Sequence, residues 1–454
     1  MQTNFTLTQL ADPEVARSER ILRNCVHCGF CTATCPTYLL LGDELDSPRG
    51  RIYLIKDMME KGRPADELTV KHIDRCLSCL SCMTTCPSGV DYMHLVDHAR
   101  AYIEKTYKRP LIDRMMRSFM ARVLPNPSLM GPSLRAAALA KPLGGFFNKR
   151  LPAGDRIAAL LELATFPSSA KKWETAPQGN IRKGRVALLA GCAQSVLQPS
   201  INQAAARLLT RHGIEVVSAK GEGCCGGLVH HMGREDDAHR YARKNIDAWI
   251  SEMDGGGLDS IVITTSGCGT TIKDYGGMFR EDRDYAAKAK RVSAIARDIT
   301  EYLATLALNR PARGTGQTIA YHSACSMQHG QKIKEPPKRL LAQMGFNVKD
   351  IPESHICCGS AGIYNIMQPQ IARRLRARKV ANIEKTKPEI IAAGNIGCIA
   401  QIGHGTALPI VHTVELIDWA QGGPLPAALA DCGFKDRHAS AVQGERPNSE
   451  AAMA

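Results

Sequence analysis

Long apolar runs are missing from this sequence of 454 residues. Its longer ones, such as residues 186–190 and 390–393, fall far short of the roughly 18 residues that a transmembrane helix needs. The first ten residues, MQTNFTLTQL, also lack the basic start and the apolar stretch of a signal peptide. We therefore expect no membrane span, and a reducing, cytoplasmic environment in which cysteine thiols stay free for metal.

Negative charge is also scarce. The chain has 44 Asp and Glu residues against 58 Lys and Arg residues, which gives a net charge of +14. Such an excess favours nucleic acid, an anionic membrane surface or an acidic partner. No RNP, zinc-finger or helix-turn-helix pattern accompanies the charge, so we predict that nucleic acid is not a partner.

Cysteine, by contrast, is abundant, and eight of the 17 cysteines form two C-x2-C-x2-C-x3-C-P runs. This is the bacterial ferredoxin spacing for [4Fe–4S] clusters, in which the cysteine before the proline ligates the other cluster. We therefore assign the ligands crosswise. One cluster takes Cys25, Cys28, Cys31 and Cys86, and the second takes Cys76, Cys79, Cys82 and Cys35.

Zinc and disulfides are the alternative uses of these thiols. Two four-cysteine zinc sites would need only two C-x2-C pairs each, which leaves part of each run and both trailing prolines unexplained. A disulfide framework conflicts with a reducing environment. The two runs therefore predict two iron–sulfur clusters.

Helical patterns surround the two runs. A Ser47-Pro48 start is followed by apolar residues at helical spacing, and a further helix is expected from about Tyr92 to Lys105. We predict an α-helical ferredoxin domain over residues 1–107, in which the clusters lie between helices.

Residues 108–180 form a basic, amphipathic connecting region. Apolar residues from Leu111 to Leu124 recur on one helical face, with arginines on the other side. This face either lies on a membrane or a partner subunit, or packs against the next domain.

The second half of the chain is an internal repeat. Its members are Cys192, Cys224, Cys225 and Cys268 in the first copy, and Cys325, Cys357, Cys358 and Cys398 in the second. The spacing is regular, since 325 − 192 and 357 − 224 both give 133 and 398 − 268 gives 130. Each copy alternates three strands with helices, so we expect two duplicated parallel α/β modules, at residues 181–310 and 311–424. The remainder, residues 425–454, is rich in Ala and Pro and is expected to be disordered.

The repeated cysteines follow the ends of strands, where parallel sheets place their ligands. Four converging thiols suit an iron–sulfur cluster, a zinc ion or a thiol–disulfide redox site. Buried structural cysteines are the plainest alternative, but they do not explain why four positions recur in both copies. No histidine is assigned a ligand role, because a lone histidine is more often a core or surface residue.

These segments together resemble the family of glycolate oxidase iron–sulfur subunits. The resemblance rests on CVHCGFCTATCP, RCLSCLSCMTTCP, GCCG, SGCG, HICCGSAG and NIGC, and extends to about residue 420. The wider family includes electron-transfer subunits of anaerobic glycerol-3-phosphate dehydrogenase, lactate-utilisation proteins and heterodisulfide reductase. There the CCG module typically ends in C-x-x-C, whereas this sequence has Thr265 and Asn395 at the first of those positions. The departure argues against a five-thiolate cluster.

The resemblance implies an electron relay. We expect no dinucleotide-binding fingerprint, and no flavin motif is recognisable, so the chain lacks a visible hydride acceptor. A separate flavin subunit would oxidise glycolate to glyoxylate and pass electrons through the clusters toward a membrane quinone. The chain would then be an oxidoreductase subunit on the inner face of the cell membrane, held peripherally by its basic residues.

Other functions stay open. The chain could reduce a disulfide at the CCG cysteines, or serve lactate or glycerol-3-phosphate dehydrogenation in place of glycolate oxidation. It could also be a docking subunit whose metals only hold the fold. A catalytic reductase would turn over a disulfide without partners, and a docking protein would tolerate a redox-inactive metal.

Overall fold

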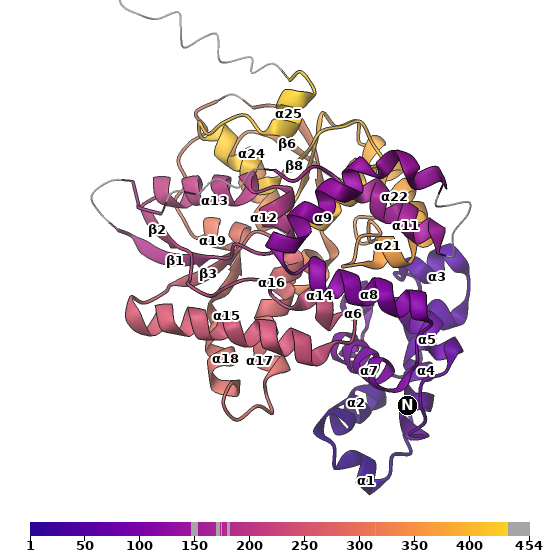
Figure 1. The fold of residues 1–454 in the computed structure, drawn as a ribbon. Helices are drawn as coiled ribbons and strands as arrows, with labels where there is room; N and C mark the ends of the chain where they lie inside the picture. Colours follow the sequence, from indigo (N-terminus) through magenta and orange to yellow (C-terminus); the bar gives the residue numbers. More distant parts are fainter. Residues whose placement is uncertain (147–152, 169–172, 174, 179–181, 314, 435–454) are drawn as a thin grey trace, which may run out of the picture.

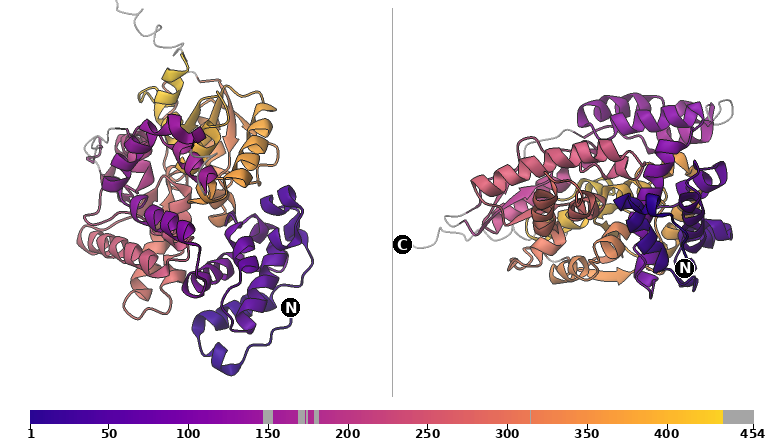
Figure 2. Two further views of the ribbon diagram at one scale, coloured as in Figure 1. Left: turned by 45° about the vertical axis from the view of Figure 1, so that its right-hand side comes forward. Right: turned by 90° about the horizontal axis from the view of Figure 1, so that it is seen from below.

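The computed structural model describes residues 1–146, 153–168, 173, 175–178, 182–313 and 315–434. A helical N-terminal part, drawn in indigo, lies beside two α/β modules drawn in pink and in orange to yellow (Figure 1). Further views show the helical part extending from one end of the α/β body (Figure 2). The multidomain fold predicted from the sequence is confirmed.

Short helices build the N-terminal part. Asp12, Ser47 and Asp66 accept hydrogen bonds from the first turns of three of them, and Pro13 and Pro48 open two. Buried apolar side chains hold the helices together. The elements are α1 (Leu7–Leu10), α2 (Pro13–Arg23), α3 (Pro36–Leu41), α4 (Pro48–Glu60), α5 (Glu67–Asp74), α6 (Ser81–Thr85) and α7 (Tyr92–Thr106), with 3₁₀ turns at Phe30–Thr32 and Glu44–Asp46.

The connecting region contributes α8 (Leu111–Val123), α9 (Pro127–Leu139), a 3₁₀ turn at Lys141–Leu143 and α11 (Gly154–Leu163). On α8, Met120 is buried together with Val229 of the first module and Ile363 of the second. Met115 and Phe119 on the same helix are 62% and 51% exposed. One side of α8 therefore packs against both modules, and its other apolar side stays open.

The first α/β module has a parallel sheet in the order β2-β1-β3-β4. Its strands are β1 (Gly184–Leu188), β2 (Ile214–Val217), β3 (Ser260–Ile263) and β4 (Ala296–Asp298). Its helices are α12 (Ala193–Leu197), α13 (Ser200–Arg211), α14 (Gly227–His230), α15 (Glu235–Gly255), α16 (Ser266–Lys273), α17 (Tyr275–Met278), α18 (Ala286–Ile295) and α19 (Ile299–Leu303).

The second module repeats this order as β6-β5-β7-β8, again parallel. Its strands are β5 (Thr318–His322), β6 (Asn347–Asp350), β7 (Ile390–Ala393) and β8 (Ile410–His412). Its helices are a short π-helix at Ser326–Gly330, α20 (Pro336–Gln343), α21 (Tyr364–Met367), α22 (Pro369–Glu384), α23 (Ile396–Gly403), α24 (Thr413–Ala420) and α25 (Ala427–Asp431).

Two expectations, one about the sheets of these modules and one about the C-terminal tail, are wrong. Each described sheet has a fourth strand, β4 or β8, where three were expected. Both are only three residues long, and Arg297 and Asp298 break the apolar pattern of β4. The tail is also ordered further than expected, because Leu429 on α25 is fully buried and Phe434 meets Trp419 edge-on. Residues 435–454 lie outside the described part of the chain.

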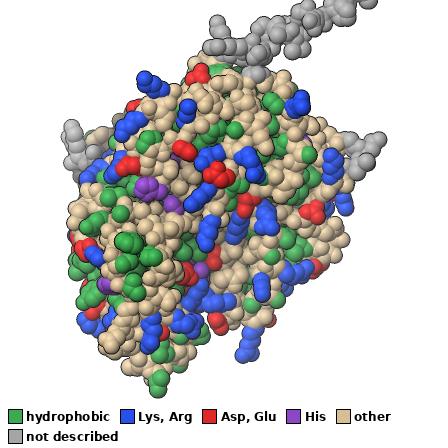
Figure 3. All heavy atoms as spheres, turned by 180° about the vertical axis from the view of Figure 1, so that it is seen from behind, with side chains coloured by type: hydrophobic (Ala, Val, Ile, Leu, Met, Phe, Trp, Pro, Cys, Tyr) green, Lys and Arg blue, Asp and Glu red, His purple; other side chains and the backbone are tan. Residues whose placement is uncertain are grey.

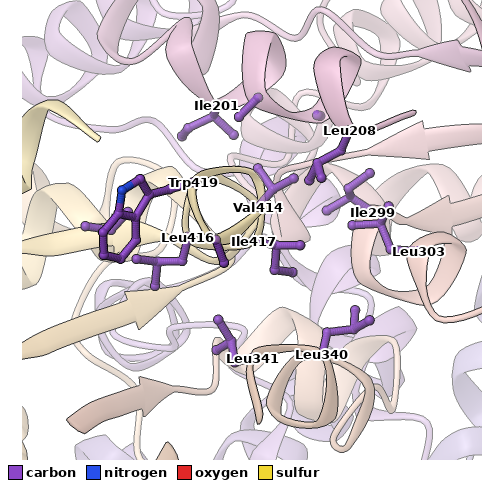
Figure 4. Packing of buried hydrophobic residues seen from close by; sticks show 14 of the residues in the cluster. Ile201, Leu208, Ile299, Leu303, Leu340, Leu341, Val414, Leu416, Ile417 and Trp419 are labelled. Carbon is purple, nitrogen blue, oxygen red and sulfur yellow. The ribbon is translucent and has the colours of Figure 1, made fainter. Parts of the chain in front are cut away.

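A shared apolar core joins the two modules. Helix α24 lies between α13 of the first module and α20 of the second (Figure 4). Leu416 and Ile417 on α24 are fully buried, as are Leu208 on α13 and Leu341 on α20. The duplicated units therefore fold against one another.

Candidate metal centres

Both ferredoxin-type loops turn through left-handed backbone at corresponding positions. The φ angles of His27 and Gly29 are 57° and 84°, and those of Ser78 and Leu80 are 47° and 61°. Residues other than glycine adopt this conformation rarely, and such residues cluster at functional sites. The two loops therefore share a tight path that lets three cysteines of each face one cavity.

Two cavities collect the eight cysteines of these loops. One is lined by Cys25, Cys28, Cys31 and Cys86, and the other by Cys35, Cys76, Cys79 and Cys82. Cys82 also reaches the wall of the first cavity. The four-thiol groups are the two crosswise sets of the sequence prediction, and four thiols around one space suit a cubane. Their role as ligands stays a prediction.

A buried arginine lies beside the second cavity. Arg51 is 1% exposed, its Nη1 lies 3.8 Å from Cys35 Sγ, and its Nη2 donates to Asp46 Oδ1 at 3.3 Å. Burial alone would raise the pKa of the Cys76 thiol, but the charges of Arg51 and Arg100 outweigh it and hold this pKa below its ordinary value. These charges favour the thiolate form of Cys76, whereas burial raises the pKa of the Cys79 and Cys82 thiols in the same cavity well above its ordinary value.

The first cavity lies nearer to the surface. Cys28 is exposed, and its neighbours Val26 and Phe30 are 66% and 62% exposed. Burial raises the pKa of the Cys31 thiol to about 11. The two cavities share Cys82 and Tyr92 in their walls, so any groups held in them would be neighbours.

In the first CCG module a glycine makes the turn that brings neighbouring cysteines together. Gly226 has a φ of 82°, and its N–H donates to Cys224 Sγ at 3.4 Å. A Cβ added at Gly226 would lie 2.8 Å from the carbonyl oxygen of Ala238, so the close approach also requires glycine. In the order Cys192, Cys224, Cys225 and Cys268, each thiol interacts with the next.

The second CCG module repeats this arrangement. Gly359 has a φ of 92° and donates its N–H to Cys357 Sγ at 3.4 Å. Asn395 Nδ2 donates to Cys398 Sγ at 3.3 Å. The four thiols again interact in order, as Cys325, Cys357, Cys358 and Cys398. Each predicted set of four is thus brought together, and what it binds stays a prediction.

Sequence reasoning assigned no ligand role to histidine, yet His322 lies at this second site. One of its ring nitrogens, Cys358 Sγ and Cys398 Sγ all lie within 4.8 Å of one another. The ring is fully buried, and neither nitrogen has a hydrogen-bond partner in the described part of the chain. Burial lowers the pKa of His322 to about 3. The available signal was its place at the end of the strand that leads into Cys325.

The second ferredoxin cavity adjoins the second CCG site. Cys79 packs against the buried cluster that contains Cys325 and Cys357. Nearby, the hydroxyl of Tyr364 donates to the carbonyl of Arg75 at 3.0 Å. The helical part and the second module therefore meet where their cysteines lie.

The expectation that the chain contains no G-x-G-x-x-G pattern after a strand is wrong for the first module. Residues 221–226 read G-E-G-C-C-G, which fits G-x-G-x-x-G and follows β2. The following helix α14 has only four residues, and two variable positions are the cysteines just described. The segment therefore lacks the long helix that a dinucleotide-binding turn opens.

Comparison with known proteins decides the family. The model for the 4Fe-4S dicluster domain matches residues 21–90, and that for the cysteine-rich CCG domain matches residues 186–273 and 319–403. The glycolate oxidase iron–sulfur subunit of Escherichia coli (strain K12) is 41% identical over 421 residues, which cover 92% of this chain and 99% of that protein. The chain belongs to the glycolate oxidase iron–sulfur subunit family.

More distant relatives share these features. A probable glycolate oxidase iron–sulfur subunit of Bacillus subtilis (strain 168) is 28% identical and covers 88% of this chain and 94% of its own. Lactate utilization protein A of Bacillus licheniformis is 25% identical, over 52% of this chain and 99% of its own. A crystal structure of a hypothetical protein from Helicobacter pylori shares the fold, with a TM-score of 0.55 at 9% identity over 92% of this chain and 74% of its own.

Membership of the glycolate oxidase iron–sulfur subunit family agrees with the expected domain types. The dicluster match contains both cysteine runs, and each CCG match contains one set of four repeated cysteines. The CCG matches begin at corresponding points, since 319 − 186 gives the repeat length of 133.

Proposed function

We propose that this chain relays electrons in a glycolate (2-hydroxy acid) oxidase complex. It would receive them from a flavin-containing subunit that oxidises glycolate to glyoxylate, and pass them toward a membrane quinone. The observation that carries the proposal is the pair of adjoining cavities, which between them are lined by all eight cysteines of the two runs. Two relatives that match over almost their whole length are named as glycolate oxidase iron–sulfur subunits, which supports glycolate as the substrate.

Two [4Fe–4S] clusters are the proposed cofactors of the helical part. Cys25, Cys28, Cys31 and Cys86 would hold one, and Cys76, Cys79, Cys82 and Cys35 the other. Such a cluster takes up and releases one electron at a time when bound. The protein's own contribution would be to exclude water from the second cavity and to offset its negative charge with Arg51, which is 1% exposed.

Membrane attachment would be peripheral. None of the helices in the described residues is long and apolar enough to cross a bilayer. On the face drawn in Figure 3, Lys and Arg side chains are spread among acidic and hydrophobic ones. We therefore propose attachment to the inner face of the cell membrane through basic residues, which a high-salt wash should reverse. Release by detergent but not by a high-salt wash would contradict an electrostatic attachment.

Reconstitution with a flavin subunit tests the relay. The purified chain alone should contain no flavin and should not oxidise glycolate. Glycolate-dependent reduction of a quinone analogue should appear when the flavin subunit is added. A Cys79→Ser variant should keep flavin reduction in the mixture and slow quinone reduction. Bound flavin in the single chain, or full quinone reduction by the variant, would overturn the proposal.

Lactate remains the alternative substrate, because lactate utilization protein A matches about half of this chain. Comparing glycolate and lactate in the reconstituted mixture decides between them.

Disulfide reduction at the CCG cysteines is less favoured than electron relay. Cys225 and Cys358 are 5% and 0% exposed, which leaves little room for a disulfide to reach them.

A further inference from the structure

We propose that His322 is a metal ligand and that, with Cys358 and Cys398, it forms a site for a single zinc ion in the second CCG module. The inference goes beyond the proposed function, which assigns no metal to the two CCG sites. It stands on a buried, unpartnered histidine whose ring reaches two thiols.

The burial of His322 is hard to explain without a ligand. The side chain is fully buried, and both ring nitrogens lack hydrogen-bond partners among the described residues. Leaving a buried polar group unsatisfied costs about 1–3 kcal/mol. A metal bond to one ring nitrogen would remove that penalty at that atom, and it needs the neutral imidazole that an apolar setting favours.

The distances suit one ion better than a cluster. The His322 nitrogen, Cys358 Sγ and Cys398 Sγ lie within 4.8 Å of one another. Zinc bonds of about 2.0–2.3 Å place tetrahedral donors roughly 3.8 Å apart, so a small contraction would complete the geometry. Cys325 and Cys357 adjoin this group and offer a fourth donor.

The polar and charged groups around the site are also consistent with a zinc ion. Two groups lie near the thiols: Asn395 Nδ2 donates to Cys398 Sγ, and Lys379 is 1% exposed. Burial lowers the pKa of Lys379, and the nearby thiols act against this by favouring its charged form. Zinc with three thiolates and one imidazole carries a net charge of about −1, which one lysine would balance. Asn395 stands where the resemblance to the wider family leads us to expect a further cysteine, and here it donates to a thiol instead of adding one.

The first CCG module provides an internal comparison. Since 322 − 133 gives 189, the position equivalent to His322 is Leu189, which is 3% exposed and packs with Cys225. Among the described residues of that module, no three metal-ligating side chains have ligand atoms that all lie within 4.8 Å of one another. The histidine site is therefore a property of the second copy, and the two CCG sites differ in chemistry.

Metal analysis of the full chain, prepared without oxygen and given Zn²⁺ alone as the added metal, tests the proposal. The native chain should hold one zinc more than a His322→Leu variant, which copies the first module. X-ray absorption at the zinc edge should show a nitrogen and sulfur shell. A His404→Leu variant is the matched control, because His404 bonds the carbonyl of Ala400 in the same module, and it should keep the zinc.

A second variant covers the case in which His322→Leu does not fold. His322→Cys should retain the ion, and in Co²⁺-loaded protein it should increase the thiolate-to-cobalt absorption. Unchanged zinc content in His322→Leu, an all-sulfur zinc shell, or iron neighbours around the site would overturn the inference. The EPR signals of the two helical-part clusters report separately on the proposed function, because none of their predicted ligands lies in this module.

Discussion

His94 Nε2 lies 3.0 Å from Asp274 Oδ1, and this contact joins helix α7 of the ferredoxin-type part to the first CCG module. The other ring nitrogen lies 2.5 Å from Asp91 Oδ2. Burial alone would lower the pKa of His94, but the two carboxylates outweigh it and raise this pKa to about 9. The ring is therefore protonated at neutral pH and donates to both.

This contact predicts a pH-dependent stability. The pKa of His94 is higher in the folded chain than its ordinary value of about 6.5, so its contribution is fully present below pH 6.5. It is lost as the pH rises through about 9. A His94→Gln variant should lose roughly 2 kcal/mol of stability at pH 6 and little at pH 10. Thermal melting across this range measures the difference.

A control separates this effect from ordinary loss of packing. His404 Nδ1 bonds a backbone carbonyl at 2.7 Å, not a carboxylate. The stability difference between native chain and a His404→Gln variant should vary less with pH. If the cost of His94→Gln is the same at pH 6 and pH 10, the protonated bridge is not what holds the parts together.

The crosswise arrangement of cysteines gives a second prediction. Cys35 lies at the cavity of the second run and Cys86 at the cavity of the first. Cys35→Ser should therefore damage the second cluster, and Cys86→Ser the first, each with a loss of up to about four iron atoms per chain. Iron and sulfide counts with EPR of the reduced protein measure this.

Partner variants identify which cluster has been damaged. The EPR spectrum of Cys86→Ser should resemble that of Cys28→Ser, and the spectrum of Cys35→Ser that of Cys79→Ser. The opposite grouping, Cys86→Ser with Cys79→Ser, would mean that each run binds its own cluster.

Arg51 should tune the second cluster. It is a buried cation whose Nη1 lies 3.8 Å from Cys35 Sγ, and its Nε donates to the carbonyl of His72 at 2.7 Å. Arg51→Met removes a positive charge that favours the reduced cluster, so the reduction potential should fall, on the order of tens of millivolts. It also leaves Asp46 with fewer partners, at a cost of roughly 3 kcal/mol.

Arg51→Lys is the matched variant for this prediction. It keeps the charge but loses the planar donors, so it should recover most of the potential and only part of the stability. Redox titration followed by EPR measures the potential, and thermal melting measures the stability. Equal reduction potentials of the second cluster in the native chain and in Arg51→Met would show that the charge of Arg51 does not affect this potential.

The shared core predicts that the two CCG modules unfold together. Leu416 on α24 is fully buried in a cluster with residues of both modules (Figure 4). Leu416→Ala should cost about 2–5 kcal/mol and shift one common transition. Calorimetry with hydrogen exchange of both sheets measures it, and exposed Leu68→Ala is the control. Separate unfolding transitions for the sheet that contains β1 and the sheet that contains β5 would contradict a common core.

Local signals in the sequence determined the module types. The two C-x2-C-x2-C-x3-C-P runs, the 133-residue repeat and the alternation of strands and helices are short-range patterns that depend on the chemistry of each segment. They predicted the helical part, the parallel sheets and the groups of cysteines. They failed at β4 and β8, because three residues are too few to make a pattern.

Tertiary structure decided what no local pattern encodes. The approach of Cys79 to the second CCG site and the burial of His322 beside Cys358 and Cys398 depend on how separate segments pack. The sequence presents His322 as the last residue of a strand, and Leu189 stands at the same place in the first copy. Only the folded chain removes water from that ring and leaves thiols as its polar neighbours, because burial is a property of the whole packing and not of the residue.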